Sequence, residues 1–182
     1  LAAARNGLRV LMVEPTRWIG GQFTSQGVPP DEHGWIERFG CTASYRGLRD
    51  GIREFYRRNY PLTDSARGVL ALNPGNGWVS PLCHEPKVSH AVIEAMLAPW
   101  VATGQLRILI EVECVAADAD RDRVRSVGID WRGERVDATA KWFVDATELG
   151  DLLPLTGAEF VTGCEAAAET GEPSAPADAR PD

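Results

Sequence analysis

The alternation of apolar and polar positions divides the beginning of the chain into a helix, a strand and a loop. Residues 1–7 are rich in alanine and end at Gly7, which predicts the last turns of a helix. Residues 10–13 are a short apolar run that stops at Glu14, and such a run is typical of a strand buried on both faces in a parallel sheet. A loop with paired glycines and small hydroxyl residues follows.

Two longer helices are predicted in the middle of the chain. Segment 47–60 has one apolar helical face, formed by Leu48, Ile52, Phe55 and Tyr56. For the arginines around that face we expect a solvated surface, with an anion site as the alternative: Arg46, Arg49, Arg53, Arg57 and Arg58. A second helix begins near Pro86, a first-turn position that suits proline, and Pro99 is expected to kink or end it.

Short runs with alternating valines predict strands in the second half of the chain. Residues 105–142 are expected to form an antiparallel meander. Residues 142–147 are predicted to return as a strand that stays apolar until Asp145, and a short helical piece follows Gly150. Residues 165–182 have almost no large apolar side chain, so we expect a linker or a disordered tail there.

Composition and charge narrow the class of protein. The chain has 182 residues, 44% hydrophobic and 25% charged, which is ordinary for a globular domain. Its net charge of −7 argues against a nucleic acid or an anionic membrane as partner, and no apolar run is long enough to span a bilayer. The four cysteines lack paired spacing, which favours a reducing, cytoplasmic compartment, and the three histidines lack metal-ligand spacing, so we expect no metal site.

The loop after the first strand carries the clearest candidate chemistry. Glu14 lies where the strand ends, and a carboxylate there accepts hydrogen bonds from both hydroxyls of a ribose. A helix N-cap or a solvated strand end is the alternative role for this residue. Gly20 and Gly21 allow close approach of backbone N–H groups to a pyrophosphate, and a plain turn is the alternative.

Three motifs resemble those of the FAD-dependent oxidoreductases that have the glutathione-reductase type of FAD fold. They are VEP at residues 13–15, GGQFTSQG at 20–27 and FVDATELGDLLPLTGAEF at 143–160. The resemblance implies an α/β fold, namely an FAD/NAD(P)-binding Rossmann-like three-layer domain with an inserted antiparallel β-meander, incomplete at both ends. It places the GxGxxG phosphate loop of the family just before residue 1. The expected organisation is a partial FAD-binding domain over residues 1–164, with a helical and loop insertion at 28–104.

The resemblance also implies which residues of the opening loop bind the cofactor. Glu14 would bind the adenosine ribose, and Gly20 and Gly21 would lie at the pyrophosphate. The residues that follow would pass under the pyrophosphate and the flavin: Gln22, Thr24, Ser25 and Gly27.

Four further cofactor-binding residues are implied in the second half of the chain. Cys114 lies in the strand whose backbone contacts the adenine edge, although Val112 could take that role and Cys114 could be an ordinary buried cysteine. Ala146 and Thr147 match the ATG-like motif of the family, in which Glu148 here replaces the usual glycine. Asp151 would bind a ribityl or ribose hydroxyl, with a helix N-cap as the alternative. No residue is assigned a catalytic role.

The expected function is that of an FAD-dependent oxidoreductase, in which flavin transfers electrons or hydride on an unidentified small-molecule substrate. One alternative is an NAD(P)-dependent dehydrogenase fragment that uses the same strand-end acid. Another is a truncated, non-catalytic domain without effective cofactor binding. Because the pyrophosphate would lack its main anchor without the GxGxxG loop, we expect the 182-residue chain alone to bind FAD poorly and to be inactive.

Overall fold

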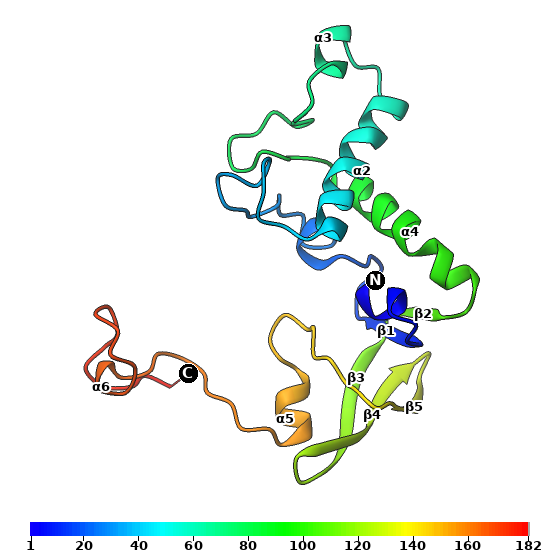
Figure 1. The fold of residues 1–182 in the computed structure, drawn as a ribbon. Coiled ribbons are helices and arrows are strands. Elements are labelled where there is room, and N and C mark those ends of the chain that lie inside the picture. The colour runs from blue at the N-terminus through cyan, green and yellow to red at the C-terminus, as the bar shows by residue number, and fades with distance from the viewer. Residues whose placement is uncertain (182) are drawn as a thin grey trace. The chain divides into compact units, whose positions relative to one another are not determined.

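The structure, a computed structural model that describes residues 1–181, has two compact units (Figure 1). The first unit, Leu1–Val112, contains α1 (Ala2–Arg5), β1 (Val10–Glu14), the 3₁₀ helix η1 (Gly21–Phe23), α2 (Ala43–Asn59), α3 (Asp64–Arg67), α4 (Pro86–Ala102) and β2 (Leu106–Ile110). The second unit begins at Glu113 and contains β3 (Glu113–Asp120), β4 (Arg123–Trp131), β5 (Glu134–Thr139), α5 (Leu152–Thr156) and α6 (Ala167–Thr170). The chain is therefore a mixed α/β protein with small sheets.

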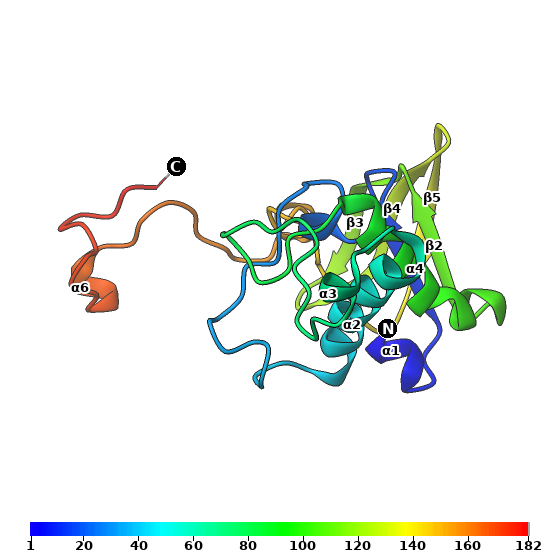
Figure 2. The ribbon, with the colours of Figure 1, turned by 90° about the horizontal axis from the view of Figure 1, so that it is seen from above.

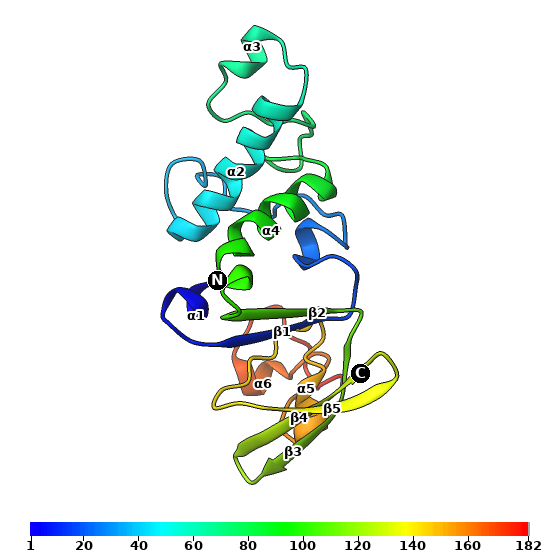
Figure 3. The ribbon, with the colours of Figure 1, turned by 90° about the vertical axis from the view of Figure 1, so that its right-hand side faces the viewer.

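In the first unit, β1 and β2 pair in parallel, from Val10 opposite Leu106 to Glu14 opposite Ile110 (Figure 3). The apolar run predicted this strand and its parallel pairing, but the prediction that both faces are buried was wrong. Leu11 is 43% exposed, because only the face with Val10 and Met12 packs on the buried cluster of Ile19, Leu97 and Leu106. A two-stranded sheet with a helix on one side leaves its other face without cover.

Helices α2 and α4 pack against each other and form the main core of the first unit (Figure 1). Helix α2 begins earlier than its apolar period predicted, because the Thr42 hydroxyl accepts a hydrogen bond from the Tyr45 N–H and caps the helix. The buried members of the core are Leu48, Ile52, Tyr56, Leu72, Leu82, Val88 and Val92. Helix α4 continues through Pro99 to Ala102, so the proline does not end it.

The arginines of α2 are the largest departure from the sequence prediction. Arg49 is 1% exposed and Arg53 is 3% exposed, so they do not form a solvated face. Arg49 donates hydrogen bonds to Glu32 and Glu37, and Arg53 donates to Glu37 Oε2 at 3.0 Å and to the Leu72 carbonyl at 2.9 Å. We call Glu32, Glu37, Arg49 and Arg53 the buried ion network. The side chain of Arg58, which is 73% exposed, does match the expected solvated role.

The electrostatic environment of the network matches its burial. Burial alone would raise the pKa of Glu37, but the hydrogen bonds and charges of Arg53 and Arg49 outweigh it and lower that pKa. The pKa of Arg49 is raised, because the hydrogen bonds and charges of Glu32 and Glu37 outweigh its desolvation. The four side chains carry two positive and two negative charges, and Arg46 adds a third cation at 3.8 Å from Glu37 Oε2.

The second unit contains an antiparallel sheet in the order β3-β4-β5 (Figure 2). Glu113 lies opposite Asp130 in the first pair, and Ser126 lies opposite Thr139 in the second. The strand predicted over residues 142–147 was wrong: these residues form no strand, and Trp142 and Val144 are 80% and 81% exposed. A strand needs a neighbour for its backbone hydrogen bonds, and no described segment pairs with this one. None of the helices within residues 1–181 is long and apolar enough to cross a membrane.

Removing Arg49 is expected to destabilise the first unit strongly. An Arg49→Ala substitution leaves the buried carboxylate of Glu32 without its cation, while Glu37 keeps Arg53, and breaking a buried pair in this way costs about 3–5 kcal/mol of unfolding free energy. The matched control is Arg58→Ala, whose exposed pair with Glu54 at i,i+4 is worth about 0.3–0.5 kcal/mol. Urea denaturation followed by circular dichroism measures both. Equal losses for the two variants would show that the network does not stabilise the fold.

Candidate functional site

Glu14 is held at the carboxyl end of β1 by a local hydrogen-bonded turn. Its Oε1 accepts the Thr16 N–H at 2.9 Å and the Thr16 hydroxyl at 2.7 Å. Its backbone carbonyl accepts the Val112 N–H at 3.2 Å. Oε2 makes no hydrogen bond within residues 1–181, so one oxygen is fixed by the protein and the other is available to a ligand. This half-used carboxylate fits the donor pattern of a ribose diol.

The loop that follows depends on glycine at its first turn. Gly20 has φ +117° and Gly21 has φ +50°, a region that L side chains rarely adopt. A Cβ at Gly20 would lie 2.8 Å from Ile93 Cδ1 and 2.8 Å from Thr24 Cγ2, so only glycine fits there. The backbone then enters η1, whose N-cap is Gly20.

The other predicted residues of this loop divide by what their side chains do. Thr24 is 2% exposed and donates to the Ile19 carbonyl at 2.9 Å, so its hydroxyl holds the loop together. Gln22 Nε2 donates to the Pro29 carbonyl at 3.3 Å, and Ser25 Oγ donates to the Gly21 carbonyl at 3.4 Å. Gly27 has φ +66° and closes the loop. The predicted residues from Glu14 to Gly27 thus lie in one continuous segment of the first unit, which runs from the end of β1 through η1.

In the second unit, the predicted residues gather around Asp145, which the sequence interpretation did not include in the site. Asp145 Oδ1 accepts the Thr147 N–H at 3.0 Å and the Thr147 hydroxyl at 2.7 Å, and Oδ2 accepts the Leu152 N–H at 2.9 Å. The Asp151 N–H donates to the Thr147 hydroxyl at 2.7 Å. The signal that could have identified Asp145 is the Asp-x-Thr spacing, which is typical of a turn closed by the acidic side chain.

Asp145 also takes the capping role that was the alternative for Asp151. Asp151 occupies the N-cap position of α5, but its side chain makes no capping hydrogen bond and the residue is exposed. Because Asp145 accepts the Leu152 N–H, it satisfies the start of that helix instead. The carboxylate of Asp151 is therefore not committed to capping, and Ala146 is likewise exposed.

Cys114 lies in β3 opposite Ile129, and α5 packs against the same strand. Burial raises the pKa of its thiol, and the negative charges of Asp145 and Asp151 add to the effect. The structure thus brings Cys114, Thr147 and Asp151 into one neighbourhood. Val112, the alternative to Cys114, lies in the first unit, where it is 1% exposed and donates its N–H to Glu14.

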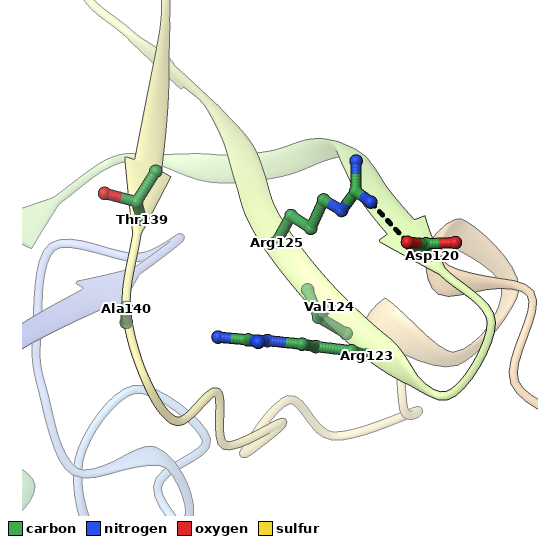
Figure 4. A pocket seen from close by; sticks show the side chains of 6 residues that line it. All are labelled: Asp120, Arg123, Val124, Arg125, Thr139 and Ala140. Atoms are coloured by element: carbon green, nitrogen blue, oxygen red, sulfur yellow. Dashed lines mark hydrogen bonds and ion pairs between the residues drawn. The ribbon is translucent and has the colours of Figure 1, made fainter.

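Two surface hollows lie elsewhere, each within one unit. One, of about 350 Å³, is lined by the β4 arginines with Asp120, Val124, Thr139 and Ala140 (Figure 4). There Arg125 pairs with Asp120, while the side chain of Arg123 points away from this pair (Figure 4). The other, of about 730 Å³, lies along α2 near Arg53 and Arg57. Neither hollow contains a predicted cofactor-binding residue, and among residues 1–181 no group of three His, Cys, Asp or Glu side chains could hold a metal ion.

Comparison with protein families decides the identity of the chain. The model of the family described as FAD dependent oxidoreductase matches residues 1–180. The chain belongs to this family. Comparison with curated proteins found no match, and neither did comparison with solved structures.

Membership in the FAD-dependent oxidoreductase family confirms the resemblance seen in the three motifs, and with it FAD as the cofactor. The mixed α/β architecture with small sheets agrees with this family. The residues present also fit the group chemically, because Glu14 keeps a free acceptor oxygen and no atom lies within 4 Å of the place that a Cβ at Gly21 would take. When bound, FAD supplies the electron-transfer chemistry, and the chain supplies binding and orientation.

Acidification is expected to release α5 through Asp145. Burial opposes ionisation of this carboxyl, but the hydrogen bonds from Thr147 and Leu152 outweigh it, so the pKa of Asp145 is lowered. A carboxyl group whose pKa falls on folding stabilises fully above its unfolded pKa of about 4, and that stability is lost as the pH falls through the folded pKa. The protection of the Leu152 amide, measured as its exchange rate relative to the intrinsic rate at the same pH, should therefore decrease below pH ~4.

Amide exchange at neutral pH tests which acid, Asp145 or Asp151, caps α5. Asp145→Ala should speed exchange in α5 and cost about 1 kcal/mol, the usual value of a lost N-cap. Asp151→Ala is the control and should leave exchange unchanged, because its side chain makes no capping hydrogen bond. The opposite result would return the capping role to Asp151.

Proposed function

We propose that the protein is a flavoenzyme that oxidises or reduces a small molecule by electron or hydride transfer through FAD. The observation that supports this most strongly is the family match over residues 1–180 together with the half-used carboxylate of Glu14 at the end of β1. A nicotinamide-dependent dehydrogenase is not favoured, because the family is defined by FAD.

In this proposal each predicted residue of the first unit has one task. Glu14 Oε2 accepts the hydroxyls of the adenosine ribose, while Thr16 holds Oε1 in place. Gly20 and Gly21 let the backbone pass close to the pyrophosphate. Thr24 acts through its hydrogen bond to Ile19, which keeps the loop in shape, and the other members of the loop lie along the cofactor: Gln22, Ser25 and Gly27.

Within the second unit, the proposal assigns the backbone near Cys114 to the adenine edge and the Ala146–Thr147 segment to the phosphates. Asp151 takes a ribityl or ribose hydroxyl, a role supported by its exposed carboxylate. Residues 1–164 would be an FAD-binding domain of Rossmann type, with 28–104 and 105–142 as its insertions and the remainder as a linker. The four free cysteines support a reducing, cytoplasmic compartment.

The first test is the presence of flavin. The full-length protein purified from cells should carry the visible absorbance of a flavin, or gain it when FAD is added and excess cofactor is removed. A full-length protein that stays colourless under both conditions would refute the proposed function. Release by heat and fluorescence of the freed flavin would distinguish FAD from FMN.

The second test concerns Glu14. Glu14→Ala removes a charged acceptor of the ribose hydroxyls, and a hydrogen bond of this kind is worth about 1.5–3 kcal/mol, or about tenfold to a hundredfold in FAD dissociation constant. The control is Glu94→Gln on the exposed side of α4, which should not change affinity. Thermal melts of the apo form check that Glu14→Ala still folds. Unchanged affinity in a folded variant would remove Glu14 from the site.

A further inference from the structure

Helix α4 lies directly against the proposed cofactor loop, residues 19–27 (Figure 3). At the start of this loop, Ile19 belongs to the same buried cluster as Leu97 of α4. At the next residue, a Cβ placed on Gly20 would lie 2.8 Å from Ile93 Cδ1, so the backbone of the loop touches the helix there. The first turn of the loop is therefore supported by α4.

The second half of the loop meets earlier turns of the same helix. The Ser89 hydroxyl donates a hydrogen bond to the Phe23 carbonyl, 66 residues away along the chain. A Cβ placed on Gly27 would lie 4.0 Å from Pro86 Cγ, which is an ordinary van der Waals distance. The loop is thus in contact with α4 at both of its ends and between them.

These contacts follow a regular order along the two segments. The pairs, with the loop residue first, are Ile19 with Leu97, Gly20 with Ile93, Phe23 with Ser89 and Gly27 with Pro86. The loop therefore runs antiparallel to the helix. The four helix residues are three or four positions apart, which is the spacing of one face of an α-helix. One face of α4 thus supports the loop over its whole length.

The contact of Ser89 is the polar one of these four, and it is sealed from solvent. Ser89 is 0% exposed, and its hydroxyl lies within hydrogen-bond distance of two acceptors, the Phe23 carbonyl and, at 2.8 Å, the Pro86 carbonyl of its own helix. Only the bond to Phe23 joins the helix to the loop. Apolar contacts are non-directional, whereas a hydrogen bond has a preferred distance and angle, so Ser89 fixes where the loop sits on α4.

We propose that α4 holds the cofactor loop in its binding conformation and that Ser89 is a positioning residue of the FAD site. Its hydroxyl acts through Phe23 on the backbone of η1, which begins at Gly21 beside the proposed pyrophosphate position. The fixation of the loop by Ser89 stands on this geometry alone, whereas its effect on FAD rests on the proposed flavoenzyme function. Because α4 lies within residues 28–104, this segment contributes to the cofactor site.

The test compares two buried serines of the first unit in the full-length protein. Ser89→Ala removes the hydroxyl that meets the loop. Ser80→Ala is the matched control, because Ser80 is 4% exposed and its hydroxyl accepts the Leu82 N–H at 3.1 Å rather than bonding to the loop. Thermal melts of the apo forms give the general loss of stability in each variant, and binding is measured at a temperature at which both are folded.

The first readout is FAD affinity. We expect Ser89→Ala to raise the FAD dissociation constant about threefold to tenfold, because the loop loses a neutral hydrogen bond that holds it in place. Ser80→Ala should leave the constant unchanged. Ser89→Cys keeps a weaker donor at a similar size and should give a smaller increase in the same direction, so it replaces the alanine variant if that one does not fold.

The second readout is amide exchange without flavin, which does not depend on the proposed function. The Thr24 N–H donates to the Gly21 carbonyl at 3.1 Å and reports the conformation of the loop. It should exchange faster in Ser89→Ala than in Ser80→Ala. The amide of Ile52, which is 1% exposed in α2, reports global unfolding and should not distinguish the two variants.

The outcomes separate the two proposals. Equal Thr24 exchange in the two serine variants would overturn the role of Ser89 in holding the loop. A flavin-bearing wild type whose FAD affinity is the same in Ser89→Ala and Ser80→Ala would refute Ser89 as a positioning residue of the FAD site, while the flavoenzyme function stands. A wild type that binds no flavin, but whose Thr24 amide loses protection in Ser89→Ala, would refute the flavoenzyme function and keep the role of Ser89 in the loop.

Discussion

The fold of the first unit depends on burying the guanidinium group of Arg49. A buried cation is tolerated only with opposite charge and hydrogen bonds around it, and here Glu32 and Glu37 supply both. Both acids lie in residues 28–41, a segment without helices or strands of its own. The pairing therefore fixes an irregular segment to α2. The Val28 N–H donates to the Gln22 carbonyl at 2.9 Å, so this segment continues directly into the loop proposed to hold the cofactor.

The same hydrogen-bonded turn occurs at Glu14 and at Asp145, and the two acids differ in what their second oxygen does. Glu14 and Asp145 each follow an apolar run, and each accepts both the N–H and the hydroxyl of a threonine two residues later. The second oxygen of Asp145 accepts the Leu152 N–H, so this side chain stabilises the start of α5. Glu14 keeps its second oxygen free. The free oxygen of Glu14 supports the ligand-binding role proposed for it, whereas the hydrogen bond from Leu152 gives Asp145 a role in the stability of α5.

Hydrophobic period was enough to predict the elements that pack against one another. It predicted the contact faces of α2 and α4 and the parallel strand β1, because each of these elements places apolar side chains on the face that packs. It failed where polar groups decide the structure. Arg49 and Arg53 lie within a helix whose sequence suggests a solvated side, and the acids that bury them are 12–17 residues away along the chain. The strand prediction for residues 142–147 failed for a related reason. A strand forms only where a second segment supplies backbone hydrogen bonds, and the sequence of one segment does not show whether such a partner exists. Of the candidate site, Glu14 and the glycines could be named from their local pattern, while the role of Asp145 required the coordinates of Leu152.

Burying Arg49 leaves unpaired polar atoms near α2 within the described residues. Glu32 holds Arg49 and Tyr45 through Oε1 alone, so Oε2 carries a desolvation cost that no contact within the described chain offsets. His84 likewise fixes its ring through Nδ1 and leaves Nε2 unused. In the same network Glu37, whose side chain is 27% exposed, accepts hydrogen bonds from the arginines at both oxygens. Within the described residues, Glu32 and His84, like His33, therefore each keep one unpaired polar atom, and the apolar core of α2 and α4 must offset this desolvation cost.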